Sequence, residues 1–258
     1  MVCPTRSMRS EGQRRRACAA AAIVGAELVG SCLLGVAMAK YPGGTSIDHA
    51  ALGHHFWRNF LCDLTEDVAL DGRANPGAWE ARIGLFVLAA SLTAFWWIAV
   101  PGAGGQSRFA RWAKGAGSLS FGIMTAILVF PQLFDNLHSA GVIAAALGGL
   151  LAATCTAAMQ TGTHPTRVPA ALGMITVAGA LVTTGLYVQY LARGGPAPLS
   201  LTAGQKLTLA TALLWIGATC AVPATKCKTA GARPPPGPRA GPTPTTAAGP
   251  SIRACARS

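Results

Sequence analysis

Charged residues are scarce in this sequence. Of its 258 residues, 12% are charged and 51% are apolar, whereas a soluble globular domain usually has about 25% charged residues. This shortage of solvating side chains argues against a soluble enzyme, and the apolar majority argues against a disordered chain. The composition is typical of a membrane protein.

Motifs for phosphate, zinc or redox chemistry are also missing. No two of the eight cysteines have the C-x-x-C spacing of a zinc or redox site, and no Gly-Lys-Ser/Thr follows a glycine-rich segment. Only Cys62 lies in the predicted outer loop, so a framework of extracellular disulfides is not expected. The cysteines are predicted to be small apolar side chains.

The basic charge of the sequence, +12 overall, lies at its two ends. Residues 1–16 contain five arginines and one glutamate, and residues 225–258 contain six basic residues and no acidic one. The proline-rich segment 225–258 cannot bury a core, so we expect a disordered tail. Both basic tails are predicted to attract anionic lipid headgroups of the bilayer. Because 225–258 has no aromatic residue for base stacking, no nucleic acid is expected as a partner.

The body of the chain, 17–224, contains six long stretches with little or no charge. Crossing the hydrocarbon core of a bilayer takes about 20 mostly apolar helical residues, and a helix satisfies every backbone group within its own segment. The sequence therefore predicts an all-α integral membrane bundle of six transmembrane helices, near 17–39, 83–101, 117–134, 139–159, 169–192 and 207–223.

The distribution of lysine and arginine predicts the orientation. With the N-terminus inside, fifteen basic residues lie on the cytoplasmic side and six on the outer side, as the positive-inside bias requires. Both termini are predicted to be cytoplasmic, with the chain in the cell (plasma) membrane.

An alternative interpretation applies to residues 17–39. Arg14-Arg15-Arg16, an apolar run and Ala37-Met38-Ala39 resemble a secretory signal with its small-residue cleavage site. The run is longer than an ordinary signal core and contains Glu27, which favours a retained helix.

Glu27 itself lies near the middle of the first predicted helix. An ionised carboxylate is costly there, and acids inside a membrane are functional candidates. We expect Glu27 to be protonated or to face a wet cavity, and proton-coupled transport is the function that it suggests. The structural alternative is a neutral carboxyl group hydrogen-bonded to another helix.

Small residues follow one face of the predicted helix 139–159 at steps of four, namely Gly141, Ala145, Gly149, Ala153 and Ala157. Such a stripe lets helix backbones approach closely in a membrane. It predicts a central position for this helix, and it leaves a homo-oligomer open as a partner.

The predicted outer loop, 40–82, concentrates the chemically active side chains. It contains six of the nine acidic residues and three of the five histidines. An amphipathic helix is predicted from Asp48 to Leu70, because apolar residues recur at steps of four. His55, Asn59 and Asp63 form a polar stripe beside them.

A second polar pair is expected on the same side of the membrane. Asp135 and His138 are three residues apart in the connection between the third and fourth predicted helices. With His55 and Asp63 they could bind a divalent metal or form an acid–base pair, and Asn59 is a further candidate. No other cofactor is expected. In the structural alternative, Asp135 and His138 cap helix ends and the loop residues make solvated hydrogen bonds.

Three loop segments carry a family resemblance, namely Tyr41-Pro42-Gly43-Gly44, the run from Phe56 to Leu64, and Asp71-Gly72-Arg73-Ala74-Asn75. They resemble uncharacterised bacterial six-helix membrane proteins catalogued around domain of unknown function 998. Members carry an Asn-x-Leu-Ser-Asp-Leu-like segment after the first helix, and Cys62 stands here where serine is common. The resemblance implies a six-helix fold and emphasises Asn59 and Asp63, but it implies no activity.

The sequence thus favours a multi-pass membrane protein that binds a lipid or small molecule, senses, or maintains the envelope. One alternative is a metal-dependent membrane hydrolase acting on lipid or amide bonds through His55, Asp63, Asp135 and His138. Another is a proton-coupled transporter that uses Glu27.

Overall fold

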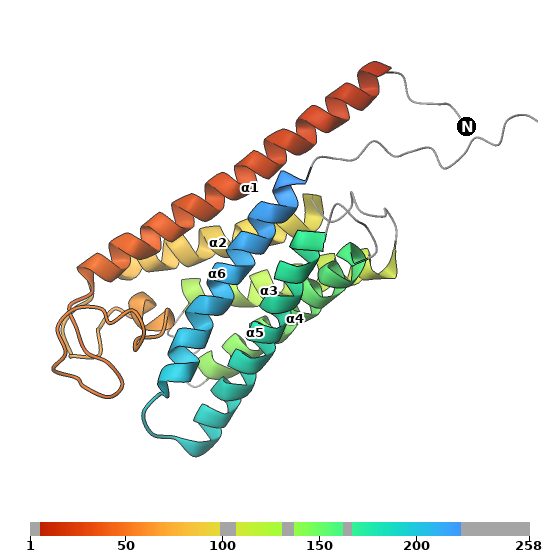
Figure 1. Ribbon diagram of the computed structural model, residues 1–258. Helices are drawn as coiled ribbons and strands as arrows, with labels where there is room; N and C mark the ends of the chain where they lie inside the picture. Colours follow the sequence, from red (N-terminus) through yellow and green to blue (C-terminus); the bar gives the residue numbers. More distant parts are fainter. Residues whose placement is uncertain (1–5, 99–106, 131–136, 162–166, 223–258) are drawn as a thin grey trace, which may run out of the picture. The chain divides into compact units, whose positions relative to one another are not determined.

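The computed structural model describes residues 6–98, 107–130, 137–161 and 167–222. Six α-helices and one short 3-10 helix make up its regular structure, and these residues contain no strand (Figure 1). The helices are α1 (Arg6–Lys40), α2 (Ala78–Ile98), α3 (Arg108–Val129), α4 (His138–Gln160), α5 (Arg167–Arg193) and α6 (Leu199–Ala221), and the 3-10 helix is η1 (Cys62–Thr65). The predicted all-α class is confirmed.

Several helices begin earlier than predicted, because they continue from their apolar cores into charged segments. In α1 the added turns include an ion pair between Arg15 and Glu11, whose atoms lie 2.6 Å apart. At the start of α3, the Ser107 side chain accepts a hydrogen bond from the backbone N–H of Ala110, which is an N-cap. The length of the charge-free runs therefore predicts well where the helices lie and poorly where they end.

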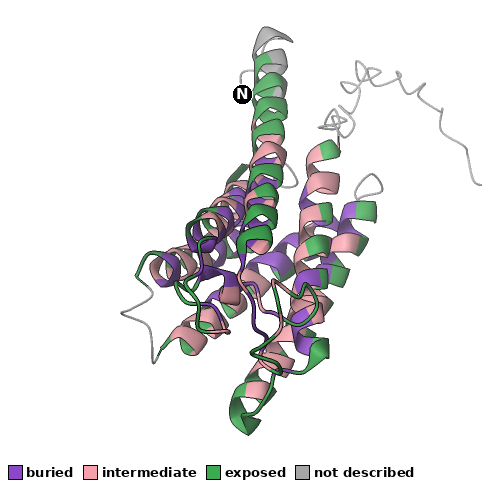
Figure 2. Cartoon of the chain, turned by 90° about the vertical axis from the view of Figure 1, so that its left-hand side faces the viewer, coloured by how far each residue is buried: buried purple, intermediate pink, exposed green. Residues whose placement is uncertain are grey.

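Five helices, α1 to α5, are long and apolar enough to cross a membrane. Helix α6 is not apolar enough over such a length, because Gln205 and Lys206 lie in its second turn. Exposed residues lie along the outside of the bundle (Figure 2). They include the large apolar residues Leu181, Val182 and Leu214, each at least 60% exposed. Exposed apolar surface of this extent is compatible with a multi-pass membrane protein.

Each helix packs against the next one in the chain, and α6 returns to pack against α1. Helices α1 and α2 approach each other closely where Gly30 and Gly84 face each other. A Cβ atom on Gly84 would lie 3.0 Å from the Gly30 carbonyl oxygen, so glycine permits this contact.

The connection from α1 to α2, residues 41–77, corrects one prediction. The amphipathic helix expected over Asp48 to Leu70 is not formed: the segment is irregular apart from η1 and two isolated antiparallel bridges. Of the residues assigned to its apolar face, Leu52 is 82% exposed whereas Leu64 is fully buried. Gly53, at φ 68°, interrupts the helical conformation, and side chains bond to backbone groups that a helix would use.

Candidate functional site

Asn59 organises the connection between α1 and α2. Its side chain is fully buried. The amide nitrogen donates to the Gly44 carbonyl at 2.8 Å and to Asp63 Oδ2 at 3.3 Å, and Oδ1 accepts the N–H of His55 at 2.9 Å. Asn59 thus joins the beginning and the middle of the loop through one amide group.

The backbone at Gly44 fits closely against this centre. Gly44 has a φ of 89°, and a Cβ there would lie 2.5 Å from the backbone nitrogen of Asp71. Only glycine combines this left-handed conformation with so close an approach. The Tyr41-Pro42-Gly43-Gly44 segment therefore places the carbonyl that Asn59 binds.

Asp63, which the sequence placed on one polar stripe with Asn59, accepts a hydrogen bond from the amide of Asn59. Its Oδ2 also accepts the N–H of Phe60 at 2.8 Å. Burial raises the pKa of Asp63 above its ordinary value, although the hydrogen bonds from Phe60 and Asn59 and the charge of Lys206 lower it. The carboxylate is committed to holding the turn that precedes η1.

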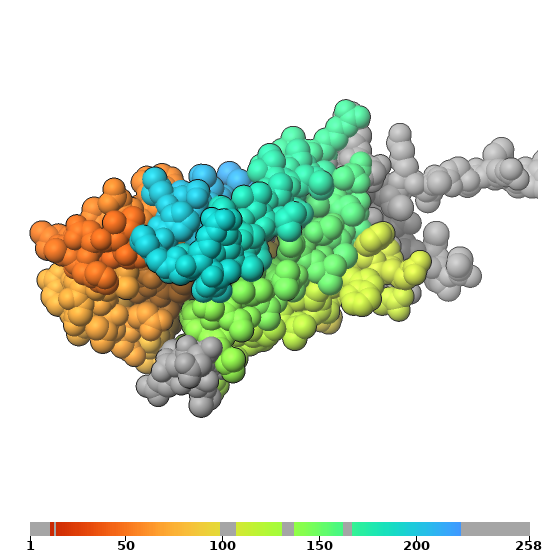
Figure 3. All heavy atoms as spheres, turned by 90° about the horizontal axis from the view of Figure 1, so that it is seen from below, coloured from red at the N-terminus to blue at the C-terminus, as the bar shows by residue number. Residues whose placement is uncertain are grey.

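The start of α6 anchors this turn from the far end of the sequence. Three polar side chains on one face of the helix bond to loop backbone: the Thr202 hydroxyl donates to the Trp57 carbonyl, Gln205 Oε1 accepts the N–H of Leu61 at 3.0 Å, and the Lys206 ammonium donates to the Asn59 carbonyl. Figure 3 shows the loop and the start of α6 side by side. These contacts were not predicted from the sequence, although Thr202, Gln205 and Lys206 share helical spacing.

His54 lies at the edge of this cluster and contacts the ring of Tyr41 edge-on, with 5.8 Å between the ring centroids. Its Nε2 is buried and has no hydrogen-bond partner among the described residues. Burial, together with the nearby charges of Lys206 and His55, lowers the pKa of His54 to about 4.

A pH-dependent loss of stability follows from this His54 pKa. The pKa of His54 is near 6.5 in the unfolded chain and about 4 in the fold. The contribution of the neutral His54 side chain to the free energy of unfolding is therefore complete above pH 6.5. It falls as the pH drops from 6.5 towards 4, since protons then bind preferentially to the unfolded chain. We expect His54→Gln to be less sensitive than the wild type to this change, as measured by thermal unfolding in detergent at pH 7.5 and 4.5. Equal sensitivity would contradict the assignment.

The remaining candidates do not join Asn59 and Asp63 in one described site. The His55 side chain is exposed, and His55 bonds to Asn59 only through its backbone, by its N–H to Asn59 Oδ1 and by its carbonyl from the Asn59 N–H. His138 begins α4, and Asp135 lies outside the described residues. Among residues that the structure describes, no three His, Cys, Asp or Glu side chains are grouped closely enough to hold a metal ion.

Glu27 is buried in the bundle, with 6% of its surface exposed. Its Oε1 finds no hydrogen-bond partner in the described part of the chain. Glu27 is not among the residues that line the cavity between α2, α3, α4, α5 and α6.

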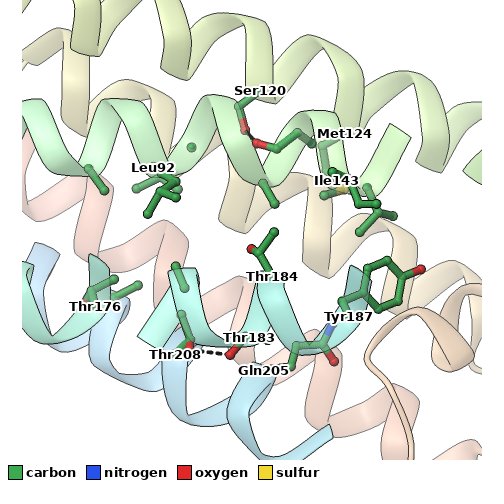
Figure 4. A pocket seen from close by; sticks show the side chains of 18 of the residues that line it. Leu92, Ser120, Met124, Ile143, Thr176, Thr183, Thr184, Tyr187, Gln205 and Thr208 are labelled. Carbon is green, nitrogen blue, oxygen red and sulfur yellow. Dashed lines mark hydrogen bonds between the residues drawn. The ribbon is translucent and has the colours of Figure 1, made fainter. Parts of the chain in front are cut away.

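A cavity of about 320 Å³ lies inside the bundle, between α2, α3, α4, α5 and α6 (Figure 4). Its volume falls in the usual range for ligand pockets and is about twice that of an engineered apolar cavity that binds benzene. The lining is mostly apolar and carries no ionisable acid or base apart from Cys62 and Tyr187. It consists of Phe60, Cys62, Leu92, Trp96, Ser120, Met124, Val142, Ile143, Ala145, Ala146, Gly149, Leu150, Ala153, Thr176, Ala180, Thr183, Thr184, Tyr187, Leu201, Gln205, Thr208, Ala212 and Trp215.

The cavity extends from the loop towards the opposite end of the bundle. Figure 4 shows Tyr187 and Gln205 at one end and Leu92 and Thr176 at the other. Gln205 is held against the loop by its bond from Leu61, and Phe60 packs on Tyr187 with ring centroids 6.3 Å apart. The loop therefore closes one end of the cavity.

Cys62 contributes a thiol to the cavity wall at this end. Burial raises its pKa to about 12, and the neighbouring charge of Asp63 adds to the effect. The thiol stays protonated at neutral pH and behaves as a small apolar group, because the thiolate is the reactive form.

The cavity is the feature that sequence reasoning missed entirely. Its walls are built from alanine, glycine, threonine and large apolar residues of five helices, and no local pattern distinguishes them from ordinary packing residues. The chain matches no family model, and neither a curated protein nor a solved structure is significantly similar to it.

Proposed function

We propose that this chain is a multi-pass membrane protein that binds a lipid chain or another apolar small molecule in its central cavity. The observation that carries the proposal is the 320 Å³ cavity lined by residues of five helices. Helices at this depth normally close on one another, because packed protein interiors leave few voids larger than a water molecule. Burying apolar ligand surface in such a space is favourable.

The loop supports a binding function over catalysis at the predicted polar cluster. The amide of Asn59 and one carboxylate oxygen of Asp63 are occupied by the chain's own groups. These bonds fix the loop that closes the cavity, which is a structural task. Glu27 lies away from the cavity lining, so coupling of transport to its protonation has no direct route to a bound ligand.

The topology is part of the proposal. We infer six spans with α1 retained, both termini in the cytoplasm, and residues 41–77 on the outer face of a bacterial cell membrane. The even number of helices and the neutral exposed surfaces support this arrangement, as does the close packing of α1 on α2 at Gly30. The basic tails would then meet anionic lipid headgroups.

Filling the cavity tests the proposed function. Ala146 on α4 lines the cavity, whereas Ala144 on the same helix is exposed. We expect Ala146→Phe to weaken binding of the neutral dye N-phenyl-1-naphthylamine by about tenfold or more, a loss of 1.4 kcal/mol or more, because the new ring occupies the ligand's space. Binding is measured by dye fluorescence with detergent-purified protein.

Ala144→Phe is the matched control, since it adds the same ring on the outer side of the helix. It should bind the dye as the wild type does. If Ala146→Phe also binds normally while remaining folded, the dye does not enter the cavity and the proposed function is wrong.

A further inference from the structure

The side-chain amide of Gln205 offers donors on the cavity wall. Its Oε1 accepts the N–H of Leu61 at 3.0 Å, and because an N–H group can only donate, this bond fixes the amide oxygen on the side of the loop. The amide nitrogen bonds to no other described residue, and it is not among the fully buried atoms that lack a partner. The N–H groups of Gln205 are therefore available to a ligand.

The hydroxyl of Thr184 on α5 is a second group of this kind. Threonine hydroxyls inside a helix often donate to the carbonyl four residues earlier, as Thr176 does to Leu172 at 2.9 Å. Thr184 makes no hydrogen bond of its side chain within the part of the chain that the structure describes, and its oxygen is not fully buried. Figure 4 shows its side chain pointing from α5 into the cavity.

Thr184 and Gln205 lie close together where α5 packs against α6. The hydroxyl of the preceding Thr183 pairs with Thr208 at 3.3 Å, and it would lie 3.0 Å from a Cβ atom on Gly204. Gln205 directly follows Gly204, so the same turn of α6 faces the turn of α5 that carries Thr184. One ligand atom between the two helices can therefore meet both side chains.

The remaining polar side chains of the lining offer less to a ligand. The indole nitrogen of Trp96 has no partner among the described residues, but it is fully buried. Cys62 supplies only a thiol, which is a weak donor. Hydroxyl and indole groups that already bond within the protein belong to Ser120, Thr176, Thr183, Tyr187, Thr208 and Trp215. Recognition of a polar ligand group therefore depends on Gln205 and Thr184.

The lining also determines the charge of the ligand. The described residues that line the cavity include no lysine, arginine, histidine, aspartate or glutamate. A charged ligand group would lose its hydration there without gaining a counter-charge, which is strongly unfavourable. The part of the ligand inside the cavity is therefore uncharged.

We propose that the ligand is a neutral lipid or similar elongated molecule whose carbonyl oxygen accepts hydrogen bonds from Gln205 Nε2 and from the Thr184 hydroxyl. This inference rests on the proposed function. A carbonyl oxygen has two lone pairs and can accept from both donors. The carbonyl lies in the part of the cavity near the loop, and the apolar chain extends towards Leu92 and Thr176 (Figure 4).

Two probes of equal chain length, tridecane and tridecan-2-one, test the proposal. Each displaces N-phenyl-1-naphthylamine from the detergent-purified full chain, and the ratio of their displacement constants is the measured quantity. Because each probe partitions into the micelles equally for every variant, a change in this ratio reports on the binding site. Thr184→Val should reduce the preference for the ketone by about three- to tenfold, the worth of one hydrogen bond, because it removes the hydroxyl and keeps the shape.

Thr176→Val is the matched control on the same helix. It removes a hydroxyl from the wall of the same cavity, but one that already donates to the Leu172 carbonyl. The ratio should therefore stay at the wild-type value. An equal loss of preference in both variants, or no loss in Thr184→Val, would overturn the role of Thr184.

Gln205→Met tests the second donor. Methionine has a similar length and no N–H, so a three- to tenfold loss of the ketone preference is again expected, about one hydrogen bond. The variant also loses the acceptor for Leu61. Thr202→Val controls for that loss, because it removes another bond from α6 to the loop and Thr202 is not part of the cavity lining. A wild-type ratio in Gln205→Met, or an equal loss in Thr202→Val, would overturn the role of Gln205.

The two proposals fail in different ways. If neither the dye nor the probes bind the wild type, the proposed function is wrong. If they bind and the ratio is the same in the wild type, Thr184→Val and Gln205→Met, the cavity still binds apolar ligands, and only the two hydrogen bonds to the carbonyl are refuted.

Discussion

Gly117→Ala is expected to destabilise the protein by about 3 kcal/mol, at the upper end of the usual cost of overpacking. A Cβ atom at this position on α3 would lie 1.9 Å from Cε3 of Trp96. The indole is buried and must move away, and the free space beside it is the cavity that it lines. The substitution should therefore lower both stability and dye affinity.

Titration with sodium dodecyl sulfate in mixed micelles measures the free energy of unfolding. Gly115→Ala is the control on the same helix, because a Cβ there meets nothing within 4 Å. It should be neutral or slightly stabilising, since alanine favours a helix more than glycine does. Unchanged stability in Gly117→Ala would mean that α2 and α3 pack less closely than described.

Asn59→Ala is expected to release the loop between α1 and α2. The variant loses two donated hydrogen bonds and one accepted bond at a fully buried position. At about 1 kcal/mol for each bond, local opening of the loop becomes easier by about 3 kcal/mol. When the loop opens and closes fast relative to cleavage, the rate of proteolysis follows the equilibrium population of the open loop. Trypsin should then cut after Arg58 about 100-fold faster.

Two further variants test whether the hydrogen bonds of the Asn59 amide account for the faster cleavage. His55→Ala removes an exposed side chain and keeps the backbone N–H that Asn59 accepts, so it should be cleaved at the wild-type rate. Asn59→Asp retains the size and the accepting oxygen but loses both donated bonds, and it should be cleaved about as fast as Asn59→Ala. A wild-type rate in both Asn59 variants would refute the central role of this amide.

The helices were predictable from sequence because a membrane span needs a long apolar run, which is a local property. Helix ends were not, since Ser107 and the charged first turns of α3 extend the helix beyond the apolar run. The loop between α1 and α2 was predicted less well than the helices. Apolar spacing over 48–70 predicted a helix, but Gly53 and bonds from side chains to backbone produced an irregular path.

Two parts of the predicted polar stripe of His55, Asn59 and Asp63 are close together in spite of that error. The N–H of Asn59 bonds to the His55 carbonyl at 3.0 Å, which is one local helical turn, and Asp63 approaches Asn59 through its own side chain, at 3.3 Å. The contacts from α6 could not be predicted in this way. Lys206 is 147 residues from Asn59, and no local pattern reports which partner a distant side chain will have.

This separation along the chain also determines when the loop between α1 and α2 can form. Ribosomes add about 5–20 residues per second, so the 147 residues between Asn59 and Lys206 take roughly 7–30 s to synthesise. During that time the carbonyls of Trp57 and Asn59 lack their donors from α6. The loop leaves the ribosome directly after the first helix, yet it reaches its final structure only after the start of α6 has been synthesised. The loop is thus among the last parts of the helical bundle to be completed.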